Sequence, residues 1–555
     1  MKHRSSSRGP SSPLSPKPTA AQQGQASTGW EKRVTKATVV EKVLVFTLAH
    51  IKVIIVLFSV LLLLIFSNEV ERSIPVGFMV DDPVRPGHLF DKSLIKTKLP
   101  VVFVPGFITT ALELWEGDLC AVGGAWSPFR QRMLSAQSFL TMLRNPSCFL
   151  RHFSLDPRTA GDPEGVKVRP DSSFSSADYL VFGFWVWAKL IVNLADIGYD
   201  PNTMYIASYD WRLDAETAER RDKYFSRLRA YVEASFDGDR FVLVGHSYGS
   251  SVIQEFLLWA DNRSPGWTET YVDSIFDIAG PFLGVPKAFG ALISGEVKDT
   301  ALMPSALRYL LDSHIDKPER TRAFRTWPCL TALLPSGGDC VWPSVLNLTD
   351  SAHVSTNLNG SAALHFLSGL MNSTGHSYNE LNVRNRLRSF EARSRLPRAP
   401  STTVYCVFGT GLPSETAYSF KPEAYRGEVM WAIDPDAHND TWTHPLQGQG
   451  TLRSGVGLVD GDGTVPLISL GYPCRSPNGF QQDVGRVVTY EVPHAQSSVM
   501  DLRGGSATAD HVDIIGNYDV ISALLMVVTG NGADVHDRIS SKLDEMVAAV
   551  DKCRA

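Results

Sequence analysis

The chain has 555 residues, of which 44% are hydrophobic and 20% charged, as expected for a globular protein with two or three average domains or one enlarged, capped α/β domain. Its formal net charge at pH 7 is −5, and basic residues cluster only near the N-terminus. Nucleic-acid binding needs a clustered basic surface, so composition and charge exclude a nucleic-acid partner.

The N-terminal segment divides into a polar and an apolar part. Residues 1–42 are rich in Ser, Pro, Gln, Lys and Arg, which predicts a disordered basic tail. From Val43 to Phe66 the sequence is predominantly apolar. About 20 helical residues cross a bilayer, so we predict an uncleaved transmembrane anchor over 43–67. The alternative is a helix buried in a protein core.

Charges beside the predicted anchor indicate its orientation. Lysines and arginines precede it, whereas Glu69 and Glu71 follow it. The positive-inside rule then predicts a single-pass type II protein with a cytosolic N-terminus and a lumenal remainder. Five Asn-x-Ser/Thr sequons lie beyond the anchor, although Pro265 makes the first a poor glycosylation acceptor. They begin at Asn262, Asn347, Asn359, Asn372 and Asn439.

All seven cysteines also lie beyond the anchor, where an oxidising lumen would permit disulfides. None belongs to a CxxC or a metal-ligand cluster, so we expect neither a metal site nor a bound cofactor. Their spacing suggests two local pairs, with reduced buried cysteines as the alternative for each. The pairs are Cys120 with Cys148 and Cys329 with Cys340.

Near-continuous apolar runs recur along the chain and are separated by helical stretches such as Ala215 to Phe236. This pattern predicts an α/β fold with a mostly parallel sheet covered on both faces. The predicted strands are 100–104, 204–208, 240–244, 275–278, 403–408 and 486–492.

The strand pattern also predicts how the chain is organised. It breaks into irregular sequence rich in Pro, Ser and Gly between two groups of strands, which is typical of a cap inserted over a pocket. The expected segments are a linker (68–96), the first part of an α/β-hydrolase core (97–290) with a lid (112–150), the cap (291–400), the second core part (401–530) and a C-terminal helix (531–555).

The pentapeptide Gly245-His-Ser-Tyr-Gly249 carries the strongest chemical signal. An apolar strand precedes it and a helical stretch follows it, so Ser247 is predicted at a strand–turn–helix bend with its hydroxyl exposed. Such a nucleophile elbow predicts acyl transfer through a covalent acyl-serine, against the alternative of a chance match. A similar segment, Gly375 to Asn379, lacks the last glycine and follows polar residues, so we expect a loop there.

A serine nucleophile needs a histidine base that is oriented by an acid, and in this fold the chain order is Ser, acid, His. The segment 460–466 places Asp460 and Asp462 in a glycine-rich turn after an apolar run, and either could be the acid. A calcium loop is the competing interpretation, but Gly471 or Pro473 stands where such a loop needs a bidentate glutamate.

Three histidines follow the acidic turn. His511 lies at a predicted loop-to-helix junction beyond the last strand, and it is the preferred base. His494 directly follows that strand and Pro493 and is the rival candidate, whereas His536 is expected in the C-terminal helix.

The tetrahedral intermediate of acyl transfer also needs two backbone N–H donors. One is expected from Tyr248, the residue after the nucleophile. The other is expected from Phe107, in the loop that follows the early strand. The alternative for this loop, Val104-Pro-Gly-Phe107, is a simple strand-ending turn.

Seven segments between about residues 97 and 527 together resemble the lecithin:cholesterol acyltransferase superfamily. The resemblance implies Ser247 as nucleophile, Asp462 as acid and His511 as base, leaving Asp460 a turn-stabilising role, with Phe107 and Tyr248 as oxyanion donors. The segments are Val104–Phe107, Leu112–Gly117, Ser208–Leu213, Gly245–Gly249, Gly280–Lys287, Asp460–Pro466 and Ala509–Gly516.

The same resemblance implies a disulfide between Cys120 and Cys148 in the lid and a second between Cys406 and Cys474. Trp115, in the lid, is similar to a position that contacts lipid acyl chains. The sequence departs from the pattern at Tyr248, where methionine or leucine is common. Because the donor there is a backbone N–H, the oxyanion site is expected to survive.

The resemblance further implies an acyl-CoA-independent transferase at the endoplasmic reticulum membrane. An acyl chain would pass from a membrane phospholipid to Ser247 and then to diacylglycerol, giving lysophospholipid and triacylglycerol. One alternative is a lipid hydrolase, such as a phospholipase or galactolipase, with water as acceptor. A remote alternative is a non-catalytic lipid-binding protein on the same fold.

Overall fold

A computed structural model describes residues 84–555, apart from short gaps, and the chain divides into two units at Asp82 and Pro83. The tail, the anchor predicted over 43–67 and most of the 68–96 linker lie outside the described residues. Within the described part, no helix is both long and apolar enough to span a bilayer. The gaps fall at 119, 121–130, 134–143, 173, 178, 182–183, 237, 297–314, 389–394, 426 and 497–504.

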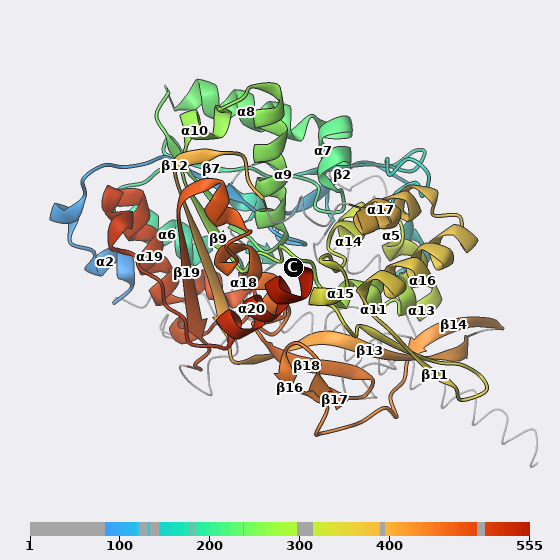
Figure 1. The fold of residues 1–555 in the computed structure, drawn as a ribbon. Coiled ribbons are helices and arrows are strands. Elements are labelled where there is room, and N and C mark those ends of the chain that lie inside the picture. Colours follow the sequence, from blue (N-terminus) through green and yellow to red (C-terminus); the bar gives the residue numbers. More distant parts are fainter. Residues whose placement is uncertain are drawn as a thin grey trace, which may run out of the picture. The chain divides into compact units, whose positions relative to one another are not determined.

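The centre of the described unit is a six-stranded sheet in the order β19-β12-β9-β8-β1-β7, in which every neighbouring pair is parallel (Figure 1). The six predicted strands are these six, so the α/β architecture is confirmed. Their bounds are β1 Val101–Val104, β7 Met204–Ile206, β8 Phe241–His246, β9 Val272–Ile278, β12 Ala399–Thr410 and β19 Val484–Pro493.

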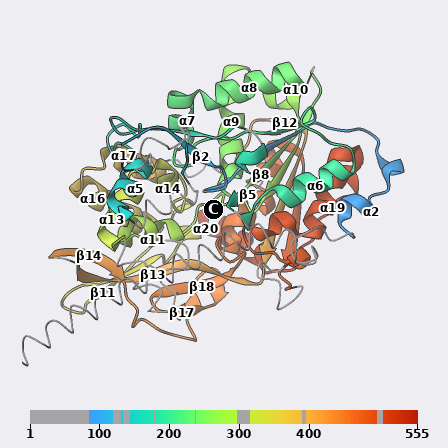
Figure 2. The ribbon, with the colours of Figure 1, turned by 180° about the vertical axis from the view of Figure 1, so that it is seen from behind.

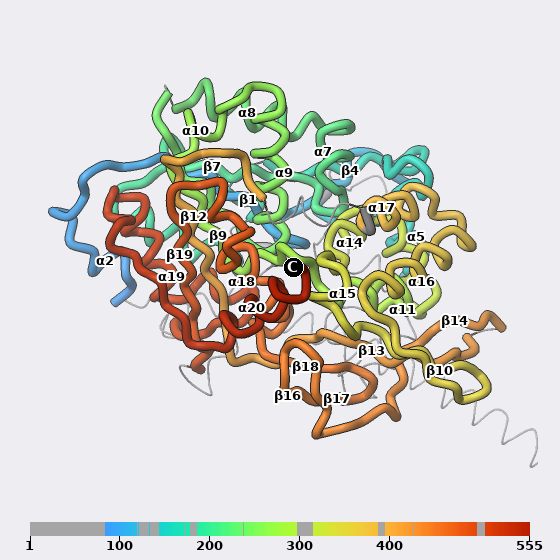
Figure 3. Tube along the Cα trace, in the orientation of Figure 1, coloured from blue at the N-terminus to red at the C-terminus, as the bar shows by residue number. Residues whose placement is uncertain are grey.

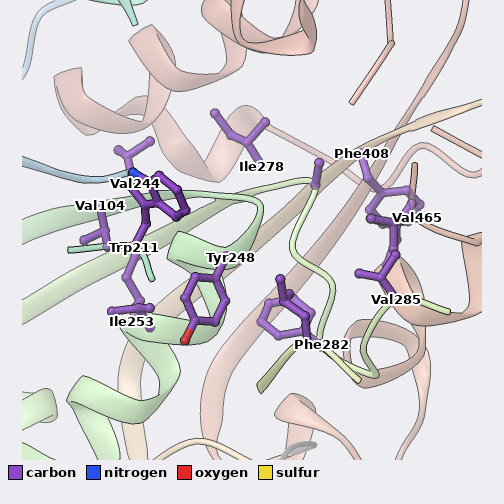
Figure 4. Packing of buried hydrophobic residues seen from close by; sticks show 14 of the residues in the cluster. Val104, Trp211, Val244, Tyr248, Ile253, Ile278, Phe282, Val285, Phe408 and Val465 are labelled. Carbon is purple, nitrogen blue, oxygen red and sulfur yellow. The ribbon is translucent and has the colours of Figure 1, made fainter. Parts of the chain in front are cut away.

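The central strands are apolar because they are buried on both faces of the sheet. Every residue of β1 and β8 is buried, as expected when helices cover both faces of a parallel sheet. In the register, Val104 lies opposite Gly245 and Gly245 lies opposite Asp277. The carboxyl ends of three neighbouring strands therefore meet beside Ser247. Figure 4 shows buried apolar side chains that four neighbouring strands contribute to the core: Val104, Val244, Ile278 and Phe408.

Two groups of helices flank the sheet. One contains α6 (Ala188–Asp196) and α19 (Tyr518–Met526), which contact each other. The other contains α8 (Tyr224–Ser235), α9 (Tyr248–Arg263) and α10 (Trp267–Tyr271). The helix predicted over 215–236 is in fact two helices, because Lys223 adopts a positive φ of 54° between α7 (Ala215–Asp222) and α8.

Residues after β9 form a second body of helices, which lies away from the central sheet in both Figure 1 and the reverse view of Figure 2. The segment expected to be irregular is thus largely helical where it is described. The helices are α11 Lys287–Ser294, α13 Lys317–Phe324, α14 Pro328–Ala332, α15 Gly338–Val341, α16 Gly360–Ser373 and α17 Ser377–Arg388.

The segment 375–379, expected to be a loop, contains the end of the turn after α16 and the first three residues of α17. Gly375 adopts a φ of 76°, and Ser377 begins α17. Because a helix precedes this serine where Ser247 has a strand, the local structure lacks a strand–turn–helix bend.

A second sheet joins strands from both sides of residue 400. β10 (Leu346–Thr349) pairs in parallel with β13 (Leu412–Tyr425), which in turn pairs with β18 (Val456–Gly461). The trace in Figure 3 shows the chain leaving the central sheet after β12 to enter this second sheet. Pairing between segments so far apart leaves no local mark in the sequence. The remaining strands of this second sheet are β11 Ser355–Leu358, β14 Glu428–Ile433 and β17 Thr451–Arg453.

Three disulfides cross-link the described residues. Cys120–Cys148 agrees with both spacing and resemblance, and Cys406–Cys474 agrees with the resemblance. The predicted pair Cys329–Cys340 is wrong, because Cys329 is a buried free thiol whose backbone N–H donates to Arg212. Cys340 instead bonds Cys553, 213 residues away, on the C-terminal helix α20 (Leu543–Arg554).

The disulfide pattern predicts the outcome of non-reducing peptide mapping. A peptide containing Cys340 should be linked to the peptide containing Cys553, and Cys329 should react with a thiol reagent only after unfolding. Replacing Cys553 with alanine should lower the free energy of unfolding by about 2–4 kcal/mol, because the loop that it closes is long. A linked Cys329–Cys340 peptide would contradict the assignment.

Candidate active site

Ser247 occupies a sharp turn between β8 and α9. Its backbone angles are φ 54° and ψ −127°, a sparsely populated region for a residue with a side chain. Its N–H donates to the carbonyl of Ile278 on the neighbouring strand at 2.9 Å, which helps to hold the strained turn in place. This local geometry is the predicted nucleophile elbow.

The two glycines of the pentapeptide allow backbone segments to approach closely. A Cβ on Gly249 would lie 2.1 Å from the carbonyl oxygen of Val104 and 2.6 Å from that of Pro105. A Cβ on Gly245 would lie 2.8 Å from the side chain of Ile253. Because real Cβ contacts are longer, both positions require glycine.

The structure brings the three predicted site residues into one hydrogen-bonded line. His511 Nε2 lies 2.8 Å from Ser247 Oγ, and His511 Nδ1 lies 2.6 Å from Asp462 Oδ2. A carboxylate only accepts hydrogen bonds, so Nδ1 carries the proton and Nε2 is left to accept the proton of the serine hydroxyl. This tautomer is the one that a general base beside Ser247 requires.

Asp462 is fully buried and its orientation is fixed by the acidic turn. Its Oδ1 accepts hydrogen bonds from the N–H groups of Thr464 at 3.0 Å and Val465 at 2.7 Å. Its backbone carbonyl accepts from the N–H of His511 at 2.8 Å. The neighbouring Asp460 is exposed and accepts from the N–H of Gly411, between β12 and β13, at 2.7 Å.

His494 and His536, the other two histidines that follow the acidic turn, have different hydrogen bonds and surroundings from His511. His494 Nδ1 accepts a hydrogen bond from the N–H of Ala509 at 3.2 Å, so this ring supports the segment that carries His511. His536 is exposed and lies between η10 (Gly532–Asp534) and α20. It precedes the C-terminal helix, and the expectation that it lies within the helix is wrong because that helix begins only at Leu543.

The loop after β1 lies directly against the elbow. A Cβ on Gly106 would lie 2.8 Å from the backbone oxygen of His246 and 3.0 Å from Ser247 Cβ. Phe107 and Tyr248, the two predicted oxyanion donors, are thus on backbone segments that flank Ser247. Ile108 adopts a φ of 61°, which is strained for a β-branched residue.

Segment 208–213 holds this loop in place, a role that sequence reasoning missed. The Tyr209 hydroxyl donates to the carbonyl of Pro105 at 2.9 Å, and Trp211 Nε1 donates to that of Thr110 at 3.1 Å. Tyr248 is tied to the same segment, because its hydroxyl donates to the carbonyl of Leu213 at 3.1 Å. A run of four aromatic or charged residues, 209–212, after a strand was the available signal.

A buried ion pair supports the same segment. Asp210 and Arg212 are both fully buried and lie 2.7 Å apart, with Arg221 at 2.8 Å from the same carboxylate oxygen. Burial alone would raise the pKa of Asp210, but the two guanidinium groups outweigh it and hold the pKa well below its ordinary value. Arg212 also donates to the carbonyl of Phe153, on the helix that ends the lid segment.

The described parts of the lid include Trp115 and a short helix. Trp115 is 38% exposed at the end of β2 (Leu112–Glu116). Helix α5 (Pro146–Phe153) is joined to Cys120 by the disulfide at Cys148. The remainder of the lid falls largely within the gaps.

One described group of side chains has atoms close enough to share a metal ion: Cys120, Cys148 and His152. The two sulfur atoms are joined in a disulfide, and metals bind the thiolate form of cysteine. This group therefore does not form a metal site.

A serine in a strained strand-to-helix turn of a parallel α/β sheet, aligned with a histidine and an aspartate, is the arrangement found in serine-dependent acyltransferases and hydrolases. The chain belongs to the lecithin:cholesterol acyltransferase family, whose sequence model matches residues 129–374 and 365–518.

Three relatives are similar over most of the chain. A phospholipid:diacylglycerol acyltransferase of Schizosaccharomyces pombe is 33% identical over 496 residues, covering 81% of this chain and 75% of the relative. The enzyme of the same name from Saccharomyces cerevisiae is 32% identical, covering 82% and 74%. Phospholipid:diacylglycerol acyltransferase 1 of Arabidopsis thaliana is 29% identical, covering 84% and 86%.

The close approach at Gly249 predicts a position-specific effect of one methyl group. Gly249→Ala should lower the free energy of unfolding by about 1–3 kcal/mol, because the added Cβ meets backbone that cannot move aside. Gly369, inside α16, has no atom within 4 Å of an added Cβ and is the control. Gly369→Ala should stabilise by about 0.5–1 kcal/mol. If chemical denaturation gives equal changes in unfolding free energy for the two variants, close backbone packing does not explain the requirement for Gly249.

A buried carboxylate beside the elbow predicts a pH effect on stability. Burial raises the pKa of Asp277, on β9, to about 7, while Ser250 and Gly280 oppose the rise. The pKa in an unfolded chain is about 3.9. Between about pH 4 and 7 the unfolded chain therefore releases a proton that the folded chain retains, and stability falls as pH rises.

Asp277→Asn removes this titration. The free energy of unfolding of the variant, minus that of the unaltered protein, should become more positive from pH 4 to pH 8 in denaturant titrations. A difference that stays constant across this range would mean that Asp277 does not titrate as described.

Proposed function

We propose that the chain is a phospholipid:diacylglycerol acyltransferase with an α/β-hydrolase fold, a lid and a cap. The observation that carries the proposal is the hydrogen-bonded line from Ser247 through His511 to Asp462, in a chain 33% identical to a relative of that name. Phospholipid is the acyl donor, diacylglycerol the acceptor, and no coenzyme A takes part.

In the first half-reaction, Ser247 Oγ attacks the ester carbonyl of the phospholipid while His511 Nε2 takes the hydroxyl proton. The N–H groups of Phe107 and Tyr248 stabilise the oxyanion. Collapse of the intermediate forms the acyl-serine, and the lysophospholipid oxygen leaves with the proton from His511. Asp462 holds the imidazole in the required tautomer.

In the second half-reaction, a diacylglycerol hydroxyl gives its proton to His511 and attacks the acyl-serine. Triacylglycerol leaves, and His511 returns the proton to Ser247. Both half-reactions use the same histidine and the same oxyanion donors, so the enzyme is regenerated without a cofactor.

The surroundings of Phe107 favour a lipid acceptor over water. The Phe107 ring lies 5.0 Å from that of Trp211, and the Trp211 ring lies 5.4 Å from that of Trp327 on the cap side. Phe153, on the lid helix, lies 6.5 Å from Trp327. These rings come from four segments of the chain, and an apolar wall of this kind beside Ser247 would keep water from the acyl-enzyme and so favour transfer over hydrolysis by a phospholipase or galactolipase.

One assay tests the proposal: membranes that contain the full chain are given phospholipid labelled in its acyl group, with diacylglycerol and no acyl-CoA. Label should appear in triacylglycerol, and Ser247→Ala should reduce the rate to background, since the nucleophile is lost. Label found solely as free fatty acid would contradict the transferase and favour the hydrolase.

The same assay discriminates between the histidines. His511→Ala should be inactive, because no base remains beside Ser247. His494→Ala should retain activity within about tenfold, since it loses one supporting hydrogen bond to the segment of His511. The reverse pattern would overturn the assignment of the base.

We further propose that the segment 43–67 anchors the protein in the endoplasmic reticulum membrane, with the enzyme in the lumen. The predicted anchor, the flanking charges and five sequons beyond it support this orientation. Of the sequon residues, Asn262, Asn372 and Asn439 are exposed. Glycosidase treatment should increase electrophoretic mobility, and Asn372→Gln should reduce the shift. No shift in the unaltered protein would contradict lumenal placement.

A further inference from the structure

His246 stands directly before Ser247, and its imidazole is buried. Its Nε2 lies 2.7 Å from the backbone oxygen of His511. Because a carbonyl oxygen only accepts hydrogen bonds, this nitrogen carries a proton and donates it. A side chain on the strand before the nucleophile thus binds the backbone of the residue proposed as the base.

The Nδ1 edge of the same ring lies against the loop that follows β1. A Cβ on Gly106 would lie 3.3 Å from His246 Nδ1, and this nitrogen has no hydrogen-bond partner among the described residues. The ring centroid lies 5.4 Å from that of His511. His246 therefore fills the space between the loop that carries Phe107 and the segment that carries His511.

Burial, and secondarily the nearby His511, lower the pKa of His246 to about 3. The ring is consequently neutral at neutral pH and has a single N–H group, which is the one that binds His511. A neutral ring also places no positive charge beside His511 when the latter takes up the serine proton.

The segment of His511 needs such support. It lies between two short 3-10 turns, η7 (Gly505–Ala507) and η8 (Asp513–Gly516), outside any sheet. Its backbone N–H is held by the carbonyl of Asp462, and its carbonyl is held by His246. The two hydrogen bonds together fix the backbone N–H and the backbone carbonyl of His511.

We propose that His246 is a positioning residue for acyl transfer: its Nε2–H group fixes the backbone of His511 and so keeps the imidazole aligned between Ser247 and Asp462. This inference rests on the proposed function, in that it assigns the base role to His511. It concerns only formation of the acyl-serine and does not depend on the identity of the acceptor.

The test compares His246→Gln with His246→Met in the full-length protein. The two side chains are similar in length, but the glutamine amide nitrogen can donate where Nε2 does, and methionine has no donor. The substrate is an activated short-chain ester, whose burst reports acylation of Ser247 without a lipid acceptor. His444→Met is the matched control, because this buried histidine, on β15 (Thr443–His444), accepts hydrogen bonds from the backbone N–H groups of Leu446 and Gln447.

His246→Met should lower the acylation rate constant about 100-fold, since a small displacement of a base has effects of this size, while KM changes less than about threefold. His246→Gln should recover the rate to within about fivefold of the unaltered protein, and His444→Met should keep it. Thermal unfolding of each variant checks that the fold is retained.

Equal rates for His246→Met and the unaltered protein would overturn the inference, as would equal losses in the Gln and Met variants. If the Met variant does not fold, the folded Gln variant decides: a rate within about fivefold supports the donor, and a loss near 100-fold refutes it. Ser247→Ala distinguishes failure of the His246 inference from failure of the proposed function, because full ester turnover by that variant would refute the proposed function itself.

Discussion

The structure of the site depends on the close approach of the turn at Ser247 to the strands beside it. Gly249 lies against the carbonyls of Val104 and Pro105 at a distance that no other residue allows. This contact forces the loop that carries Phe107 to lie beside the serine, and the parallel register brings β9 to the other side. The strained backbone of Ser247, which costs of the order of 1–3 kcal/mol, persists because neighbouring strands hold it on both sides.

The remaining parts of the site are attached to this turn by hydrogen bonds between distant segments. The second sheet delivers Asp462 at the end of β18, and Asp462 in turn holds the backbone and the ring of His511. Segment 208–213 secures the loop after β1 and, through Arg212, the helix at the end of the lid. Nucleophile, acid, base and lid therefore come from four regions that meet only in the folded chain.

Much of this could be predicted from the sequence because the signals are local. Buried parallel strands have continuous apolar runs, so all six central strands were identifiable, and a strand–turn–helix signature made Ser247 conspicuous. Asp462 and His511 followed from their order along the chain and from the resemblance. The pairing of Cys340 with Cys553 and of β10 with β13 could not be predicted, because each joins segments that are distant in sequence. The contacts of His246 and Asp210 likewise depend on burial, which spacing alone does not reveal.

If Ser247 carries the acyl group from one lipid to another, the acyl-serine intermediate can be observed directly. The full-length enzyme is acylated with labelled phospholipid, freed of excess substrate and given diacylglycerol in water. Mass spectrometry of the peptide that contains Ser247 should show the acyl adduct, and the label should then pass to triacylglycerol in a single turnover. Absence of the adduct, or its release only as free fatty acid in the presence of diacylglycerol, would contradict acyl transfer through Ser247.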